Sequence, residues 1–157
     1  MFRAVDDIGI DAYRAVMAPC GLGTLDRNDR YYWGGCGPDN WAAQMTALLD
    51  EPDAPMWLAG YLRGTPVGYV AVSSVDDWGS TIAHVGVAPE HRGDGYINEL
   101  LTAGTFAARR SGITTMLSDV DVVNRPMLAA MRRAGHREDA ERWHLWVYRA
   151  DIDHLSR

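Results

Sequence analysis

Apolar residues recur at helical spacing in two stretches near the beginning of the chain. From Asp7 to Met17 they fall on roughly one face, which predicts a first helix. A second helix is expected from Trp41 to about Leu49, with Asp39 or Asn40 as its N-cap. Residues 21–40 between them are rich in glycine, aspartate, asparagine and aromatic side chains, and they show no sustained period. We therefore expect a long functional loop there, with at most a short helical turn.

Strand patterns fill the middle of the chain. Residues 56–62 and 67–72 are rich in strand-forming side chains and flank Arg63-Gly64-Thr65-Pro66, which together predict a hairpin. A third strand is expected over Thr81–Val87. No clear opening strand precedes the first helix, because the stretch from Phe2 to Val5 is short.

After the third strand, apolar or small residues again recur at helical spacing and predict a helix: Ile97, Leu100, Leu101, Gly104 and Ala108. A further strand is expected over Thr115–Val123, a helix from Asn124 to Ala134, and a final strand over Trp143–Arg149. This order of elements predicts one α+β domain over residues 1–157, with a central mixed, mostly antiparallel twisted sheet flanked by helices.

A glycine-rich turn separates the third strand from the helix that follows it. Gly93 and Gly95 lack a Cβ, so the backbone can approach a ligand closely with its N–H groups turned outward. The positive end of the helix dipole and the Arg92 side chain suit a phosphate or pyrophosphate. We therefore expect Arg92, Gly93, Asp94, Gly95 and Tyr96 to form an anion-binding turn.

Two better-known phosphate loops do not fit this turn. The chain contains no lysine, which excludes a Walker loop, and Asn98 stands where a dinucleotide fingerprint needs its third glycine. A nucleotide-phosphate-binding module is therefore an alternative that rests on the glycine turn alone.

Charge and composition narrow the choice of partners. The 157 residues carry a formal net charge of −6, which argues against a nucleic-acid partner and favours a cationic substrate. No window reaches the roughly 20 apolar residues of a membrane span, and no signal-peptide pattern is found, so we expect a cytoplasmic protein with no membrane partner. Cys20 and Cys36 have no metal-ligand spacing, so free thiols and no metal are expected. A homodimer is left open.

Two motifs carry a resemblance to a known family. The pattern Val87-x-Pro89-x-x-Arg92-Gly93-x-Gly95, followed by Leu100-Leu101, resembles the acyl-CoA signature of the GNAT superfamily of N-acyltransferases. Downstream, the expected strand over Thr115–Val123, then Asn124-Arg125-Pro126-Met127 and a helix closing at Ala134-Gly135, resembles a later motif of that superfamily. The resemblance implies the GNAT fold and an enzyme that transfers an acetyl or other acyl group from acetyl-CoA to a primary amine. The charge suggests that the amine belongs to a small cationic molecule.

The resemblance also implies how the donor is held. The strands carrying Val85–Val87 and Ser118–Val123 should splay apart, with the pantetheine arm between them. Main-chain groups of Val85 and Val87 would bond this arm as an added strand would. Asn124 would bond the arm from the other side, and an alternative role for it is a plain helix N-cap.

The acid and the base of the reaction are harder to assign. Many relatives have a tyrosine seven residues after the asparagine, but this chain has Met131 there, which is best interpreted as core filler. His84 is a candidate base, although strand parity turns it away from the neighbouring valines unless a bulge intervenes. Asp119 and Asp121 share one face of their expected strand. They could bind a cationic amine or act as a base through water, or they could form a solvated strand edge.

Tyr31 and Tyr32, in the expected loop, are further hydroxyl groups that could protonate the leaving thiolate. Neither cysteine lies in a recognised motif, so direct attack without a covalent enzyme intermediate is expected. Because the tyrosine is missing and no base is assigned, an alternative function is that of a non-catalytic acyl-CoA-binding regulatory domain.

Overall fold

The computed structural model describes residues 1–48, 56–75 and 79–138. The strands are β1 (Phe2–Ala4), β2 (Trp57–Leu62), β3 (Thr65–Val75), β4 (Gly79–Val87) and β5 (Met116–Leu117). The helices are α1 (Val5–Ile8), α2 (Ile10–Met17), α3 (Arg27–Cys36), α4 (Pro38–Leu48), α5 (Tyr96–Arg110) and α6 (Arg125–Arg133), with 3-10 turns η1 (Ala18–Gly21) and η3 (Pro89–His91). The expected final strand over Trp143–Arg149 lies outside the described residues.

The five strands form one mixed sheet in the order β1-β2-β3-β4-β5. Neighbouring strands from β1 to β4 run antiparallel, and β5 runs parallel to β4. The expected hairpin is β2 and β3, and the expected third strand is β4. The predicted α+β class with a mostly antiparallel mixed sheet is confirmed.

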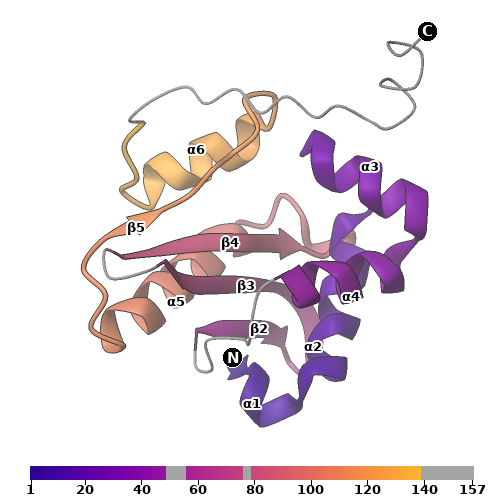
Figure 1. The fold of residues 1–157 in the computed structure, drawn as a ribbon, viewed down its shortest axis with the longest axis horizontal. Coiled ribbons are helices and arrows are strands. Elements are labelled where there is room, and N and C mark those ends of the chain that lie inside the picture. Colours follow the sequence, from indigo (N-terminus) through magenta and orange to yellow (C-terminus); the bar gives the residue numbers. More distant parts are fainter. Residues whose placement is uncertain (49–55, 76–78, 139–157) are drawn as a thin grey trace, which may run out of the picture.

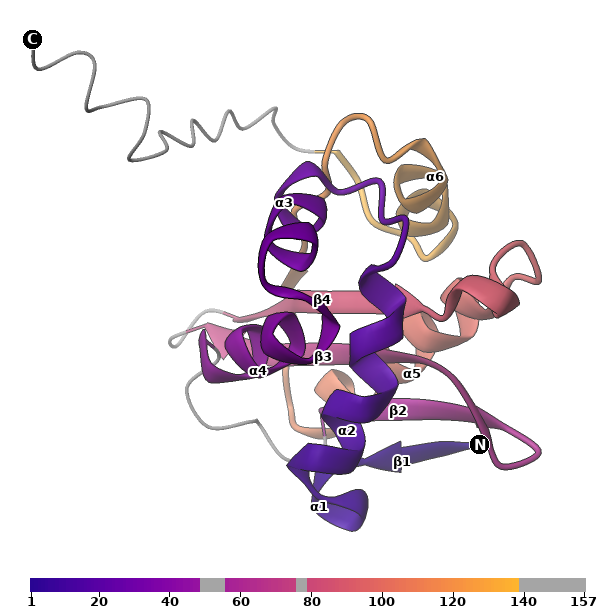
Figure 2. The ribbon, with the colours of Figure 1, turned by 90° about the vertical axis from the view of Figure 1, so that its right-hand side faces the viewer.

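Helices cover both faces of this sheet (Figures 1 and 2). The side chains of β3 alternate between the faces, so Tyr69 packs with Tyr13, Trp41 and Trp57 under α2 and α4. On the other face, Val70 and its neighbours in β3 and β4 pack with the apolar stripe of α5 and with α6. No helix of the described residues is long and apolar enough to cross a membrane.

The beginning of the chain differs from the sequence expectation in two details. A three-residue opening strand exists, β1, and Arg3 pairs with Ala59 of β2. So short a strand leaves no alternating pattern, and it is defined by its pairing with β2. The first helix is split at Gly9, whose φ of +80° interrupts it between α1 and α2.

The expected loop over residues 21–40 is instead largely helical. Asp26 caps α3, because its Oδ1 accepts hydrogen bonds from the N–H groups of Asn28 (2.9 Å) and Asp29 (3.1 Å). The helix has no fully buried residue, and only Tyr32, Trp33 and Cys36 pack partly buried against the core, so its sequence carries no long apolar stripe. Neither Asp39 nor Asn40 precedes the next helix, because α4 already begins at Pro38.

The expected strand over Thr115–Val123 is present only as Met116 and Leu117, which pair with Ser80 and Thr81 of β4. Beyond Leu117 the chain leaves the sheet and turns, with the N–H of Asn124 donating to the carbonyl of Asp121 at 2.8 Å. Asp119 and Asp121 therefore do not share the face of a strand. Residue-type preference alone could not show where the pairing ends.

An ion pair joins this segment to α3. The Arg27 side chain donates to both carboxylate oxygens of Asp121, from Nε at 2.8 Å and from Nη2 at 3.0 Å. The backbone N–H of Arg27 donates to the same carboxylate at 3.1 Å. The hydrogen bonds from the Arg27 side chain lower the pKa of Asp121 below its ordinary value of 3.8. A residue that the sequence suggested as a base is thus an anchor for α3.

The lowered pKa of Asp121 predicts a pH-dependent stability. Because the folded pKa is below the unfolded one, the stabilisation is complete above pH 3.8 and is lost as the pH falls through the folded pKa. Urea unfolding should show Asp121→Asn less stable than the wild type at pH 7, with the difference shrinking below pH 3.8. The control is Asp11→Asn, since Asp11 forms an exposed pair with Arg14. Equal effects of the two substitutions would contradict the prediction.

Candidate active site

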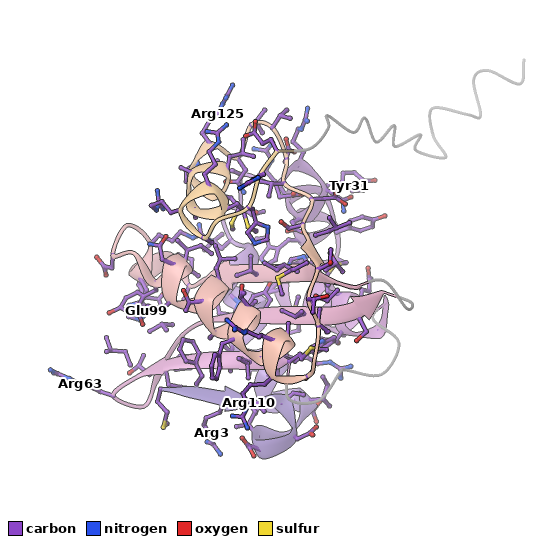
Figure 3. All side chains as sticks on the ribbon, turned by 90° about the vertical axis from the view of Figure 1, so that its left-hand side faces the viewer. Arg3, Tyr31, Arg63, Glu99, Arg110 and Arg125 are labelled. Atoms are coloured by element: carbon purple, nitrogen blue, oxygen red, sulfur yellow. The ribbon has the colours of Figure 1, made fainter. Side chains whose placement is uncertain are left out.

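A large cleft of about 2030 Å³ opens where β4 and β5 stop pairing. The last paired residues are Thr81 and Leu117. The walls are parts of α3, β4, the glycine turn, the segment after β5, and α6. Figure 2 shows α3 and α6 on opposite sides of the space above β4, and Figure 3 shows Tyr31 of α3 and Arg125 of α6 at this same end of the molecule.

A smaller, mainly apolar groove of about 790 Å³ lies beside α5. It shares no lining residue with the large cleft. The candidate catalytic and donor-binding residues, apart from Asp94, line the large cleft.

The edge of β4 that faces the cleft exposes backbone hydrogen-bonding groups. Ala88 donates its N–H to the carbonyl of Val67 at 3.0 Å. Because the antiparallel ladder alternates, the backbone groups of Gly86 also face β3, whereas those of Val85 and Val87 face the other edge. The sequence expectation that Val85 and Val87 would bind pantetheine through their main chains is compatible with this arrangement and stays a prediction.

A β-bulge interrupts β4 next to the last paired residues. Ala71 lies opposite His84 and Val72 lies opposite Ile82, so Ala83 is the extra residue. The side chains of Ile82 and Val85 consequently pack on the α5 face, and His84 contacts residues of the other face.

The glycine turn presents free backbone donors. Gly93 has φ +90° and Gly95 has φ +88°, conformations that side chains rarely adopt. The N–H groups of residues 93–97 donate to no acceptor among the described residues. They lie at the start of α5, where the helix dipole favours an anion.

Four of the five residues expected in this anion site line the cleft, and Asp94 is the exception. The Tyr96 ring meets the His91 ring edge-on, with 5.8 Å between centroids. Arg92 donates to the carbonyls of Val87 (3.1 Å), Cys20 (2.7 Å) and Gly23 (3.4 Å). Its guanidinium therefore ties the turn to the chain beside η1, and direct contact with an anion stays a prediction.

Asn124 lines the opposite wall of the cleft at the start of α6. Its Oδ1 accepts a hydrogen bond from the N–H of Met127 at 3.3 Å, so its role as an N-cap is confirmed. Contact between Asn124 and the donor stays a prediction.

Met131 is buried among apolar residues, as the sequence predicted. Beside it lies a polar pair that the sequence analysis missed. The Ser118 hydroxyl lies 3.2 Å from Nδ1 of His136 and 3.7 Å from the sulfur of Met131, and all three residues line the cleft. Burial lowers the pKa of His136 below its ordinary value of 6.5, so its imidazole is neutral at pH 7.

His84 is the centre of a hydrogen-bonded chain. Its Nδ1 lies 2.5 Å from the hydroxyl of Tyr69, and its Nε2 lies 3.1 Å from Oδ1 of Asp29. The ring also meets Trp41 edge-on at 5.4 Å. Asp29 was not expected in the site, because residues 21–40 were expected to form a loop. An Asp N-cap followed by an acidic residue in the first turn, as at Asp26 and Asp29, is nevertheless typical of a helix start.

The remaining candidate groups differ in exposure. Asp119 lines the cleft and is exposed. Cys20 is buried, and burial raises the pKa of its thiol to about 12, which removes the thiolate at neutral pH. In the part of the chain that the structure describes, no group of three or more His, Cys, Asp or Glu side chains is arranged to hold a metal ion.

Known proteins share both the sequence pattern and the fold. A sequence model of the acetyltransferase (GNAT) family matches residues 24–136. No curated protein matches the sequence.

Three solved structures illustrate the shared fold. Aminoglycoside N-acetyltransferase AAC(6')-Iy in complex with CoA is 17% identical, with a TM-score of 0.64 over 95% of this chain and 94% of that one. Aminoglycoside antibiotic 6'-N-acetyltransferase AAC(6')-IG from Acinetobacter haemolyticus is 13% identical, with a TM-score of 0.62 over 94% and 98%. YncA from Salmonella typhimurium, a putative acetyltransferase with its cofactor acetyl-CoA, is 21% identical, with a TM-score of 0.60 over 89% and 80%.

The family match covers well over half of the chain, including β4, the glycine turn and α6. The neighbours' whole-length likeness gives the same fold, and the cleft lies where both motifs meet. The chain therefore belongs to the acetyltransferase (GNAT) family of acetyl-CoA-dependent N-acetyltransferases.

Proposed function

We propose that the enzyme transfers the acetyl group of acetyl-CoA to a primary amine of a small cationic molecule by direct attack. The observation that carries this proposal is the composition of the large cleft. Its β4 edge and glycine turn offer unpaired backbone donors, and the wall formed by α3 offers the Asp29 carboxylate. One end thus suits an anionic donor and the other suits a cationic acceptor.

The donor is held mainly by backbone groups in this proposal. The pantetheine arm lies along β4 and bonds to the main chain of Val85 and Val87, as an added strand would. The pyrophosphate accepts hydrogen bonds from the N–H groups of residues 93–97, whose positions are fixed by the left-handed glycines. Asn124 closes the site from the α6 side.

The reaction needs no covalent intermediate on the enzyme. The acceptor ammonium first loses one proton to water, and its nitrogen attacks the thioester carbonyl carbon. A C–N bond forms and the C–S bond breaks, which releases the CoA thiolate. The second proton leaves the nitrogen and reaches the thiolate, giving an amide and CoA with one proton released to solvent.

The alternative function is a non-catalytic acyl-CoA-binding regulatory domain. The observation that favours it is the buried thioether of Met131, which stands where many relatives have a tyrosine hydroxyl. The Ser118 hydroxyl beside it supplies the cleft with another O–H group close to that position.

The decisive experiment is an assay of thiol release from acetyl-CoA with a panel of amines. The panel should contain aminoglycosides, polyamines and neutral amino compounds, because two proteins with this fold are named aminoglycoside N-acetyltransferases. We expect amine-dependent thiol release and an acetylated product in the mass spectrum, with cationic amines the better acceptors. Acetyl-CoA binding without transfer to any amine would support the regulatory domain instead.

A second prediction tests the anion-binding turn. Gly93→Ala should weaken acetyl-CoA binding by at least tenfold in calorimetry, because an alanine at φ +90° distorts the turn at a cost of roughly 1–2 kcal/mol. The control is Gly112→Ala, since Gly112 has φ +84°, also has open space around it, and lies outside the cleft. Both variants should lose similar stability. Equal affinities in the two folded variants would refute the role of the turn.

A third prediction concerns the cysteines. Because burial keeps the Cys20 thiol protonated, replacing Cys20 and Cys36 together by serine should leave kcat within roughly threefold of the wild type. Intact-protein mass spectrometry after incubation with acetyl-CoA should show no acetylated enzyme. An acetyl-cysteine peptide, with activity lost in the folded double variant, would instead establish a covalent route.

A further inference from the structure

Asp29 is a mostly buried carboxylate whose one side-chain partner in the described part of the chain is the imidazole of His84. Its side chain is 16% exposed and lines the cleft. Oδ1 contacts His84, and Oδ2 accepts no hydrogen bond from a described residue. Removing a carboxylate from water costs free energy unless a cation or several donors compensate, so this site favours a positively charged ligand.

Other charged groups near Asp29 are already engaged. Arg27, on the same helix, is held by Asp121 across the cleft. Asp26 caps α3 through Oδ1, which accepts a hydrogen bond from the N–H of Asp29 itself. Asp29 differs from Asp26 in that a buried imidazole, that of His84, holds its carboxylate beside the cleft.

The hydrogen-bonded chain behind Asp29 fixes the proton on His84. Burial raises the pKa of Tyr69 well above its ordinary value of 10, so the phenol keeps its proton. We assign the phenol as the donor to Nδ1 of His84, because Nδ1 is the one acceptor within its reach among the described residues. A carboxylate only accepts, so Nε2 carries the hydrogen and donates to Asp29.

This arrangement changes the role of the histidine that the sequence suggested as a base. Both ring nitrogens of His84 are occupied, so no lone pair is available to an incoming amine. The ring is also held between Tyr69, stacked at 5.9 Å between centroids, and Trp41. A ring fixed on both sides holds its Asp29 partner in one place.

We propose that Asp29 binds an ammonium group of the acceptor and that His84, supported by Tyr69, is its positioning residue. This inference rests on the proposed transfer to cationic amines and names the side chain that selects them. The substrate class it specifies is an amine that is positively charged when it enters the cleft, with its ammonium donating to Oδ2 of Asp29.

The test compares Asp29→Asn with the wild type, using the best amine of the panel. Asparagine keeps an oxygen that accepts from His84, so the fold is retained while the charge is lost. We expect KM for the amine to rise roughly tenfold or more, the usual worth of a hydrogen bond to a charged group. The acetyl-CoA affinity should stay unchanged. Added salt should raise KM in the wild type and have little effect in Asp29→Asn.

The matched control is Asp39→Asn, which removes the same charge from an exposed position in the first turn of α4, outside the cleft lining. Equal KM values for the two variants would refute the inference. His84→Gln, which can still donate to Asp29, should raise KM less than His84→Ala does. Equal effects of these two substitutions would contradict the positioning role.

Failure of the proposed function can be told apart from failure of this site. If the wild type acetylates no amine, binding of spermidine is measured directly by calorimetry with CoA present. Spermidine binding that is lost in Asp29→Asn would support the cation site without an acetyltransferase. Equal binding by both proteins, or no binding by the wild type, would refute the site.

Discussion

The brevity of the pairing between β4 and β5 is the constraint on which the rest of the site depends. Two parallel pairs, ending at Thr81 and Leu117, hold the strands together, and beyond them the backbone of each strand must find other partners. The backbone of the segment after β5 forms some of its hydrogen bonds in turns. In β4, the carbonyl of Val87 accepts from Arg92, and the backbone groups of Val85 face the cleft. The bulge at Ala83 lies at the point where the strands part. A cleft with unpaired strand groups follows directly from this divergence.

The two ends of the cleft are built by different physical means. At the glycine turn, backbone N–H groups are positioned by left-handed glycines, and the Arg92 guanidinium ties the turn to the chain beside η1. At the other end, Tyr32, Trp33 and Cys36 of α3 pack partly buried against the core, and polar contacts of Trp33, Arg27 and Asp29 add to this attachment.

Polar pairing engages two of the three sequence candidates for the base. Asp121 anchors α3 through Arg27, and His84 is occupied on both nitrogens. Asp119 remains exposed to the cleft. Asp121 and His84 are residue types compatible with acid-base chemistry, but their contacts include residues 94 and 55 positions away in the chain. Contacts between residues so far apart in the chain are set by the fold and leave no local sequence pattern.

The sequence by itself determined the elements whose signals are local. The stripe of α5, the glycines at its start, the hairpin of β2 and β3, and the Asn124 cap all depend on residues a few positions apart. Only the tertiary structure decided what depends on partners distant in the chain. These features are the strand β1, the early end of β5, the attachment of α3, and the chain of hydrogen bonds from Tyr69 through His84 to Asp29. Propensity and periodicity report on neighbours along the chain, whereas strand pairing and buried polar contacts are fixed only when the sheet has formed.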